Sequence, residues 1–101
     1  ISQTFTLSKS KIIESFSVQR QKHYNLDKTW QGLKIYSGKI YFLRGSNNAF
    51  TSGIEVIDIK SKKLVSVIPL KVSSEEPEDL EIYNNRLFVA YHSNNFALLD
   101  F

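Results

Sequence analysis

Apolar and polar residues alternate along several short stretches of the chain, and a period of two residues is typical of half-buried β-strands. The stretch 63–70 reads KLVSVIPL, so Leu64 and Ile68 fall on one side of an extended chain while Val65 and Val67 fall on the other. No segment shows a persuasive period of 3.6 residues. The sequence therefore predicts an all-β chain.

The chain contains an internal repeat. The stretch from Gln31 reads QGLKIYSGKIYFLRGS, and 47 residues later the stretch from Glu78 reads EDLEIYNNRLFVAYHS, which aligns with it without a gap. A second pair, FTLSKSKIIESFSV from Phe5 and IDIKSKKLVSVIPL from Ile57, aligns at an offset of 52 residues. Strand-rich repeats of about 40–50 residues are typical of β-propeller blades.

Each repeat is interpreted as a four-stranded antiparallel blade. The links Ser37-Gly38 and Asn84-Asn85 predict two-residue hairpin turns, because Gly and Asn adopt positive φ at low cost. The expected strands are 32–36, 39–44, 54–59 and 63–70 in the first repeat, and 79–83, 86–91 and 96–101 in the second.

These strands place about two blades in the chain, and we expect it to be the C-terminal part of a larger β-propeller. Residues 1–18 would supply the outer two strands of one blade, 31–70 a complete blade, and 78–101 the first three strands of the last blade. A propeller closes with about four to eight blades. The expected partners are therefore the remainder of the same propeller or other copies of the chain, and unpaired strand edges favour such association.

The order of the strands also predicts where a binding site lies. In a propeller the tight turns lie on one face, and the connections 19–30, 44–53, 71–78 and 92–95 lie on the other. Binding residues concentrate on such loops above a rigid scaffold. Six residues that flank these loops are the candidate ligand-binding residues: Trp30, Gln31, Arg44, Glu78, Asp79 and His92.

Several of these residues have two possible roles. Trp30 is either a stacking platform for a sugar ring or an aromatic wedge between blades. Glu78 and Asp79 are either ligands of a calcium ion, which prefers clustered carboxylate oxygens, or part of a solvated acidic loop. Asp58 and Asp100 each end a strand just before a turn and are interpreted as structural caps.

Composition and charge narrow the function classes. The chain has 13 basic and 10 acidic residues, and a net charge of +3 makes a poor footprint for nucleic acid. No apolar run reaches the roughly 18 residues of a membrane span, and the lack of cysteine excludes disulfides and thiolate chemistry. No Ser-His-Asp arrangement or Gly-rich phosphate loop is present.

The stretch QGLKIYSGKIYFLRG, together with EPEDLEIYNNRLFVAYHS from Glu76, resembles propeller domains of the helveticin J type and receptor-binding propellers of phage tails. Gln31-Gly32 and Glu76-Pro77-Glu78 match the signatures that open a blade in these proteins, whereas Asp79 stands where the family usually has Gly. The resemblance implies a non-catalytic module that recognises a bacterial cell-surface glycan or receptor, in an extracellular or virion-associated setting.

A weaker resemblance favours an enzyme. The segment EPEDLEIYNNRLFVAYHS also looks like a blade of paraoxonase-type lactonases, in which the glutamate corresponding to Glu78 is a calcium ligand. A third reading, a protein-interaction scaffold, suits the apolar strand in 53–58. We expect the glycan-recognition module, without a cofactor, and keep the calcium-dependent hydrolase and the scaffold as alternatives.

Overall fold

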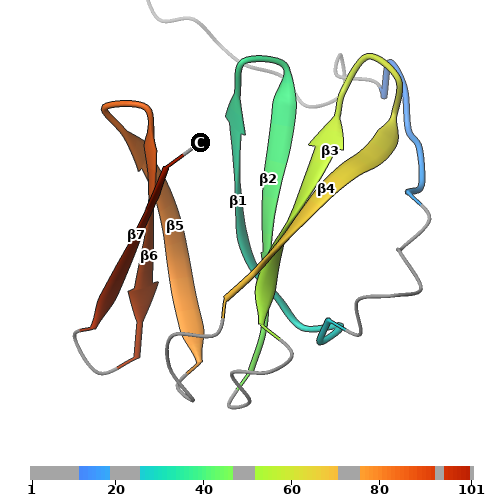
Figure 1. The fold of residues 1–101 in the computed structure, drawn as a ribbon. Coiled ribbons are helices and arrows are strands. Elements are labelled where there is room, and N and C mark those ends of the chain that lie inside the picture. The colour runs from blue at the N-terminus through green and yellow to red at the C-terminus, as the bar shows by residue number, and fades with distance from the viewer. Residues whose placement is uncertain (1–11, 19–25, 47–51, 71–75, 93–94, 101) are drawn as a thin grey trace, which may run out of the picture.

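The chain folds into two antiparallel β-sheets (Figure 1). The structure is a computed structural model, and it describes residues 12–18, 26–46, 52–70, 76–92 and 95–100. The described residues contain no helix, which agrees with the predicted all-β class, and therefore none that could cross a membrane. The strands are β1 (Trp30–Tyr36), β2 (Lys39–Arg44), β3 (Gly53–Asp58), β4 (Lys63–Pro69), β5 (Pro77–Tyr83), β6 (Arg86–Tyr91) and β7 (Phe96–Asp100).

Each strand pairs with its neighbour in the sequence. The four-stranded sheet has the order β1-β2-β3-β4 and the three-stranded sheet the order β5-β6-β7. The register shifts between Trp30 and Gly32 in β1, and between Pro77 and Asp79 in β5. Because the two shifts are 47 residues apart, the repeat seen in the sequence extends to an irregularity of the backbone.

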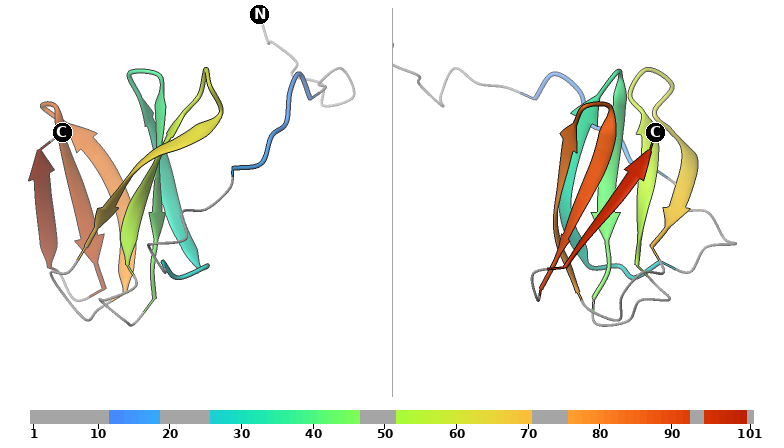
Figure 2. Two further views of the ribbon diagram at one scale, coloured as in Figure 1. Left: turned by 45° about the vertical axis from the view of Figure 1, so that its right-hand side comes forward. Right: turned by 60° about the vertical axis from the view of Figure 1, so that its left-hand side comes forward.

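The tight turns lie at one end of both sheets, and the strand ends that lead into the longer connections lie at the other, as the strand order predicts (Figures 1 and 2). Ser37 and Gly38 have φ values of 50° and 76°, and Asn84 and Asn85 have values of 50° and 59°. Two consecutive residues with positive φ are the mark of the type I′ turn, whose twist matches that of the strands it joins. The predicted hairpins are confirmed.

The turn between β3 and β4 is capped by Asp58, as expected. The Ser61 backbone N–H donates to Asp58 Oδ2 at 2.7 Å, and the Lys62 N–H donates to the Asp58 carbonyl at 2.8 Å. The Ser61 backbone N–H and hydroxyl, assisted by Lys39 and Lys60, hold the pKa of the Asp58 carboxyl below its ordinary value. The ionised carboxylate is therefore the form that stabilises the turn.

We expect the Asp58→Asn variant to have a lower melting temperature than the wild type at pH 7, with the difference shrinking as the pH falls below 3.8 and through the lowered pKa of the folded state. A pKa that is lowered on folding stabilises the protein above the unfolded value of 3.8, and this stabilisation is lost as the pH falls through the folded value. Thermal unfolding by circular dichroism at several pH values measures the difference. Asp58→Ala, which also removes the acceptor oxygen, should have a lower melting temperature than the wild type at both neutral and low pH. A difference between Asp58→Asn and the wild type that does not depend on pH would contradict the role of the charge.

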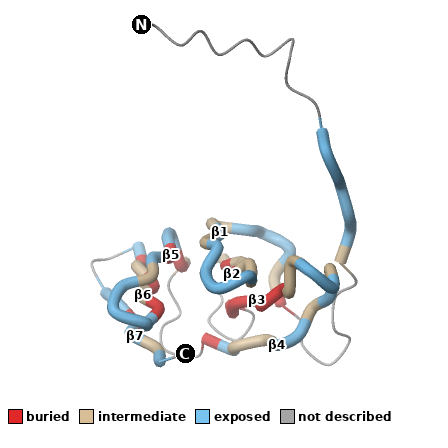
Figure 3. Tube along the Cα trace, turned by 90° about the horizontal axis from the view of Figure 1, so that it is seen from above, coloured by how far each residue is buried: buried red, intermediate tan, exposed pale blue. Residues whose placement is uncertain are grey.

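The two sheets pack face to face around one apolar core, and they appear as two separate layers when seen from above (Figure 3). The four-stranded sheet contributes Tyr41 and Leu43 from β2 and Ile54 and Val56 from β3. The three-stranded sheet contributes side chains of β5, β6 and β7: Leu80, Leu87, Val89, Tyr91 and Ala97. These positions alternate along their strands, because successive side chains of a strand point to opposite faces.

The N-terminal segment differs from the expectation. Residues 1–18 were expected to supply two outer strands of a blade; residues 1–11 lie outside the described residues, and residues 12–18 form no strand. Ile12 and Ile13 are exposed, and Glu14 forms an ion pair with Lys62 at 2.7 Å. A β-strand needs a hydrogen-bonding neighbour, and 12–18 pair with no strand among the described residues.

Candidate functional site

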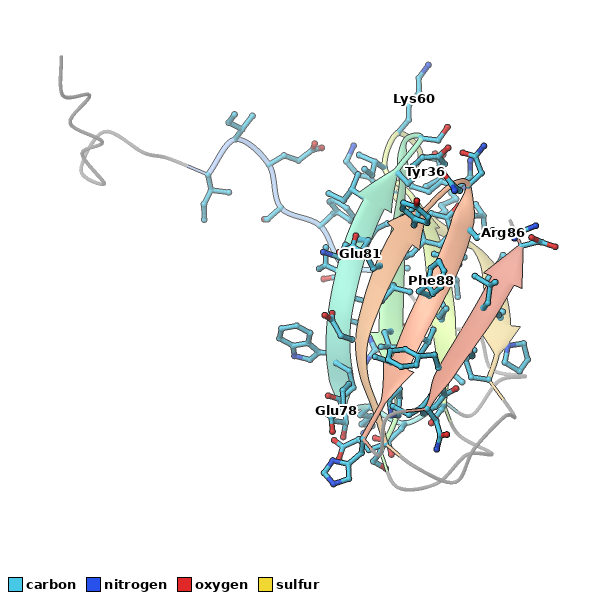
Figure 4. All side chains as sticks on the ribbon, turned by 90° about the vertical axis from the view of Figure 1, so that its left-hand side faces the viewer. Tyr36, Lys60, Glu78, Glu81, Arg86 and Phe88 are labelled. Carbon is cyan, nitrogen blue, oxygen red and sulfur yellow. The ribbon has the colours of Figure 1, made fainter. Side chains whose placement is uncertain are left out.

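The end of the sheets that carries the longer loops brings most of the candidate residues together. Strands β1 and β5 run side by side there, and Figure 4 looks onto this edge. The Gln31 side-chain amide donates to the Gly45 carbonyl at 2.9 Å and to Glu76 Oε1 at 2.6 Å. Gln31 therefore connects the two sheets and uses both hydrogens of its amide group, which leaves only its oxygen for a ligand.

Glu78 and His92 form an exposed pair at the same end. His92 Nδ1 lies 3.4 Å from Glu78 Oε1, and the His92 backbone N–H donates to the Glu76 carbonyl at 3.1 Å. Both side chains face solvent, and Figure 4 shows Glu78 at the lower end of β5. The pair offers a carboxylate and an imidazole to a polar ligand.

Asp79 is engaged within its own strand. Its Oδ1 accepts the Leu80 backbone N–H at 2.8 Å, and it is also the atom nearest to where a side chain at Gly32 would begin. In the part of the chain that the structure describes, no group of three or more His, Asp or Glu residues is placed to hold a metal ion. Glu78 and Asp79 thus stand next to each other in the sequence without further described residues completing a metal site.

Trp30 and Arg44 form a second group, on the face of the four-stranded sheet that points away from the core. The Trp30 indole is 62% exposed and stacks on Phe42, with ring centroids 6.0 Å apart and an interplanar angle of 17°. The Arg44 guanidinium lies 4.6 Å from the centre of the same Phe42 ring and donates to the Lys28 carbonyl at 2.9 Å. The indole is therefore held flat against the sheet with its other side open to solvent.

Arg44 also pairs with Glu55 of β3, a residue that the sequence analysis did not single out. Glu55 is only 5% exposed, although it lies on a sheet face that is otherwise apolar. The pair borders a depression of about 250 Å³ that is lined by side chains of β1, β2 and β3 and by Phe16 and Val18. Glu55, an acidic residue flanked by Ile54 and Val56 inside an apolar strand, was the signal in the sequence that could have indicated a buried ion pair.

Tyr91 occupies the position of the second repeat that corresponds to Arg44. It is buried in the core, and its hydroxyl has no hydrogen-bond partner among the described residues. Burial raises the pKa of this hydroxyl. Tyr91 therefore fills space with its ring at a position where the first repeat carries a charge.

No family model, no curated protein and no solved structure matches the chain. The residues of the chain and their geometry are therefore the basis for its function.

Proposed function

We propose that the two sheets are adjacent blades of a β-propeller and that the chain is a non-catalytic recognition module. Its ligand is a bacterial cell-surface glycan, bound at the end of the sheets where the longer loops lie, in an extracellular or virion-associated setting. The blade interpretation is supported by the repeat, by the bulge that recurs after 47 residues, and by two antiparallel sheets that pack face to face.

The exposed indole of Trp30 is the observation that carries the binding function. Large aromatic side chains gain free energy when they are covered, and an indole that is 62% exposed has most of this gain still to make. The C–H face of a sugar ring is flat and apolar, so it can cover the indole. Stacking on Phe42 fixes the ring before the ligand arrives, which lowers the entropic cost of binding.

Polar groups at the same end of the sheets can orient the sugar hydroxyls. The Glu78–His92 pair is exposed and supplies an acceptor and a nitrogen that donates or accepts. Binding sites for small ligands typically combine an apolar platform with a few such polar groups. Arg44 contributes indirectly, because its own donors bind Glu55 and the Lys28 carbonyl and hold the platform in place.

We expect Trp30→Ala to weaken glycan binding at least about tenfold, because the variant loses the stacking surface. Isothermal titration calorimetry with purified wall teichoic acid and with soluble peptidoglycan fragments would measure the affinity. Trp30→Phe should keep part of it, and Val65→Ala, which truncates a similarly exposed residue on β4, should leave it unchanged. Wild-type protein that binds neither polymer, or Trp30→Ala that binds as tightly as the wild type, would overturn the proposal.

A protein-interaction scaffold is the second candidate function. It is favoured by the outer faces of the two sheets, which carry exposed apolar side chains such as Leu33, Ile35, Phe96 and Leu98. Contiguous exposed apolar side chains are typical of surfaces that associate with other proteins.

A further inference from the structure

Each sheet has one face in the core and one apolar face directed outward. The outer face of the four-stranded sheet, called face 1, consists of Leu33, Ile35, Ile40, Phe42 and Ile57 around the Arg44–Glu55 pair. The outer face of the three-stranded sheet, called face 2, consists of Phe88, Ala90, Phe96 and Leu98. Leu33 is 46% exposed and Leu98 is 52% exposed, so a large part of each face is open among the described residues, although Phe16 and Val18 border face 1 beside the buried Ile57.

The repeat relates face 1 to a surface that is already buried. Leu33, Ile35, Ile40 and Phe42 correspond, 47 residues later, to Leu80, Ile82, Leu87 and Val89. Those four residues are the face of the three-stranded sheet that packs into the core. Face 1 is thus built like a surface that, in the second repeat, binds a neighbouring sheet.

Face 2 has the converse relationship. Phe88 and Ala90 correspond to Tyr41 and Leu43, and the strand registers place Phe96 and Leu98 where Ile54 and Val56 lie in the first repeat. Those residues of the four-stranded sheet are the side of the core that receives the three-stranded sheet. Inside the chain, the inner face of the four-stranded sheet corresponds to face 2, and the inner face of the three-stranded sheet corresponds to face 1. The core is therefore an interface between surfaces of these two types.

We propose that face 1 of one copy binds face 2 of a second copy, repeating between chains the contact that joins the two sheets within the chain. The occupant of each face is therefore another copy of this chain in a head-to-tail arrangement. Such an interface uses two different surfaces, so every copy added leaves one face of each type available. The assembly closes into a ring if the rotation from one copy to the next returns to the first copy, and otherwise extends into a filament.

Charges along the edge where β1 and β5 run side by side favour a second copy as the partner. Lys34 Nζ lies 3.2 Å from Glu81 Oε2, and the two residues occupy the same position of the first and second repeats. Figure 4 shows Glu81 on the edge formed by β5. When the contact is repeated between copies, Glu81 of one chain meets Lys34 of the next, so lysine and glutamate alternate along the edge. A neighbour with the same charge at this position would be repelled.

The contact rests on the repeat and the core packing, and only the expected number of copies rests on the proposed propeller. Each copy contributes two sheets, and a propeller closes with about four to eight. A ring would therefore hold about two to four copies of the 11.7 kDa chain. The two proposals share Phe42, on which Trp30 stacks, but they have separate readouts: affinity for glycan in Trp30→Ala, and molecular mass in Leu33→Arg and Leu98→Arg. A failure of one experiment is therefore distinguishable from a failure of the other.

Light scattering coupled to size-exclusion chromatography, at several concentrations, tests the contact. We expect the wild type to be a defined oligomer and both Leu33→Arg and Leu98→Arg to be monomers, because each charge blocks one face. Both residues are exposed within the chain, so these variants should keep the wild-type circular dichroism spectrum. Val65→Arg, which changes a residue that is 51% exposed on β4 and belongs to neither face, is the matched control and should stay oligomeric.

Mixing the two variants gives the sharpest result. Leu33→Arg retains face 2 and Leu98→Arg retains face 1, so an equimolar mixture should form a heterodimer that cannot grow further. A wild type that is monomeric at every concentration would overturn the proposal. An oligomer that survives both substitutions would do so as well, because it would show association through strand edges or through another surface. A mixture that stays monomeric would exclude the head-to-tail pairing.

Discussion

Arg44→Met is expected to lower the free energy of unfolding by about 3–5 kcal/mol, because it leaves the buried Glu55 carboxylate without its guanidinium partner. Glu55 is only 5% exposed, and its apolar neighbours Phe42 and Ile57 offer little solvation to a negative charge. Arg44 also holds the Lys28 carbonyl and lies over the Phe42 ring, so its loss also frees the segment that leads into β1. Urea unfolding followed by circular dichroism measures the change.

The double variant Arg44→Met/Glu55→Leu separates the charge from the packing. Replacing both partners of a buried ion pair with apolar residues is often neutral or stabilising, so the double variant should unfold within about 1 kcal/mol of the wild type or above it. Lys34→Met is the matched control, since it breaks the exposed ion pair with Glu81 and should cost about 0–1 kcal/mol. A loss for Arg44→Met no larger than that for Lys34→Met would contradict the role of the buried pair.

The strands were predictable because their signals are local. Alternation of apolar residues and the turn chemistry of Ser37-Gly38 and Asn84-Asn85 act over a few neighbouring positions, and both hairpins form as expected. The starts of β1 and β5 were expected two residues later than they occur. In each strand a bulge lies between the observed start and the expected one, and a bulge depends on the register of the partner strand, which the sequence of one strand does not contain.

The expected strand in 12–18 shows the limit of the repeat as evidence. This segment aligns with 64–70, where β4 pairs with β3, and so it shares the propensity of a strand. Two segments with similar sequences share a propensity to form a strand, but the similarity does not supply each of them with a partner strand. The described residues provide no partner strand for 12–18, and the same sequence pattern gives no strand there.

The position of the candidate site was predictable, whereas its contacts were not. Strand order alone places Trp30, Glu78 and His92 at one end of the sheets. The Arg44–Glu55 pair and the bond from Gln31 to Glu76 join residues that are 11 and 45 positions apart, and they depend on which faces of the sheets meet. Side-chain chemistry suggested that Gln31 was a ligand residue, but its amide hydrogens are used between the sheets.

Gly45 connects the end of β2 with the second sheet, and no larger residue fits there. Its φ is +153°, a value that residues with a side chain rarely adopt. A Cβ at this position would lie 2.8 Å from Pro77 Cγ and 2.9 Å from Ser52 Cβ, and closer still to the Ser52 hydroxyl. Its N–H donates to the Thr29 carbonyl and its own carbonyl accepts the Gln31 amide, so a shift of Gly45 would also displace the start of β1.

We therefore expect Gly45→Ala to lower the free energy of unfolding by about 2–6 kcal/mol, the sum of backbone strain and overpacking. Two other glycines separate these causes. Gly38→Ala, with φ +76° and no atom within 4 Å of the new Cβ, should show the cost of a positive φ alone, about 1–2 kcal/mol. Gly32→Ala, whose new Cβ would meet only Asp79 Oδ1 at 3.6 Å, should change stability by less than about 1 kcal/mol. If urea unfolding gives Gly45→Ala and Gly38→Ala the same loss, the close approach of the two sheets at Gly45 contributes nothing, and the strain of the backbone accounts for the whole effect.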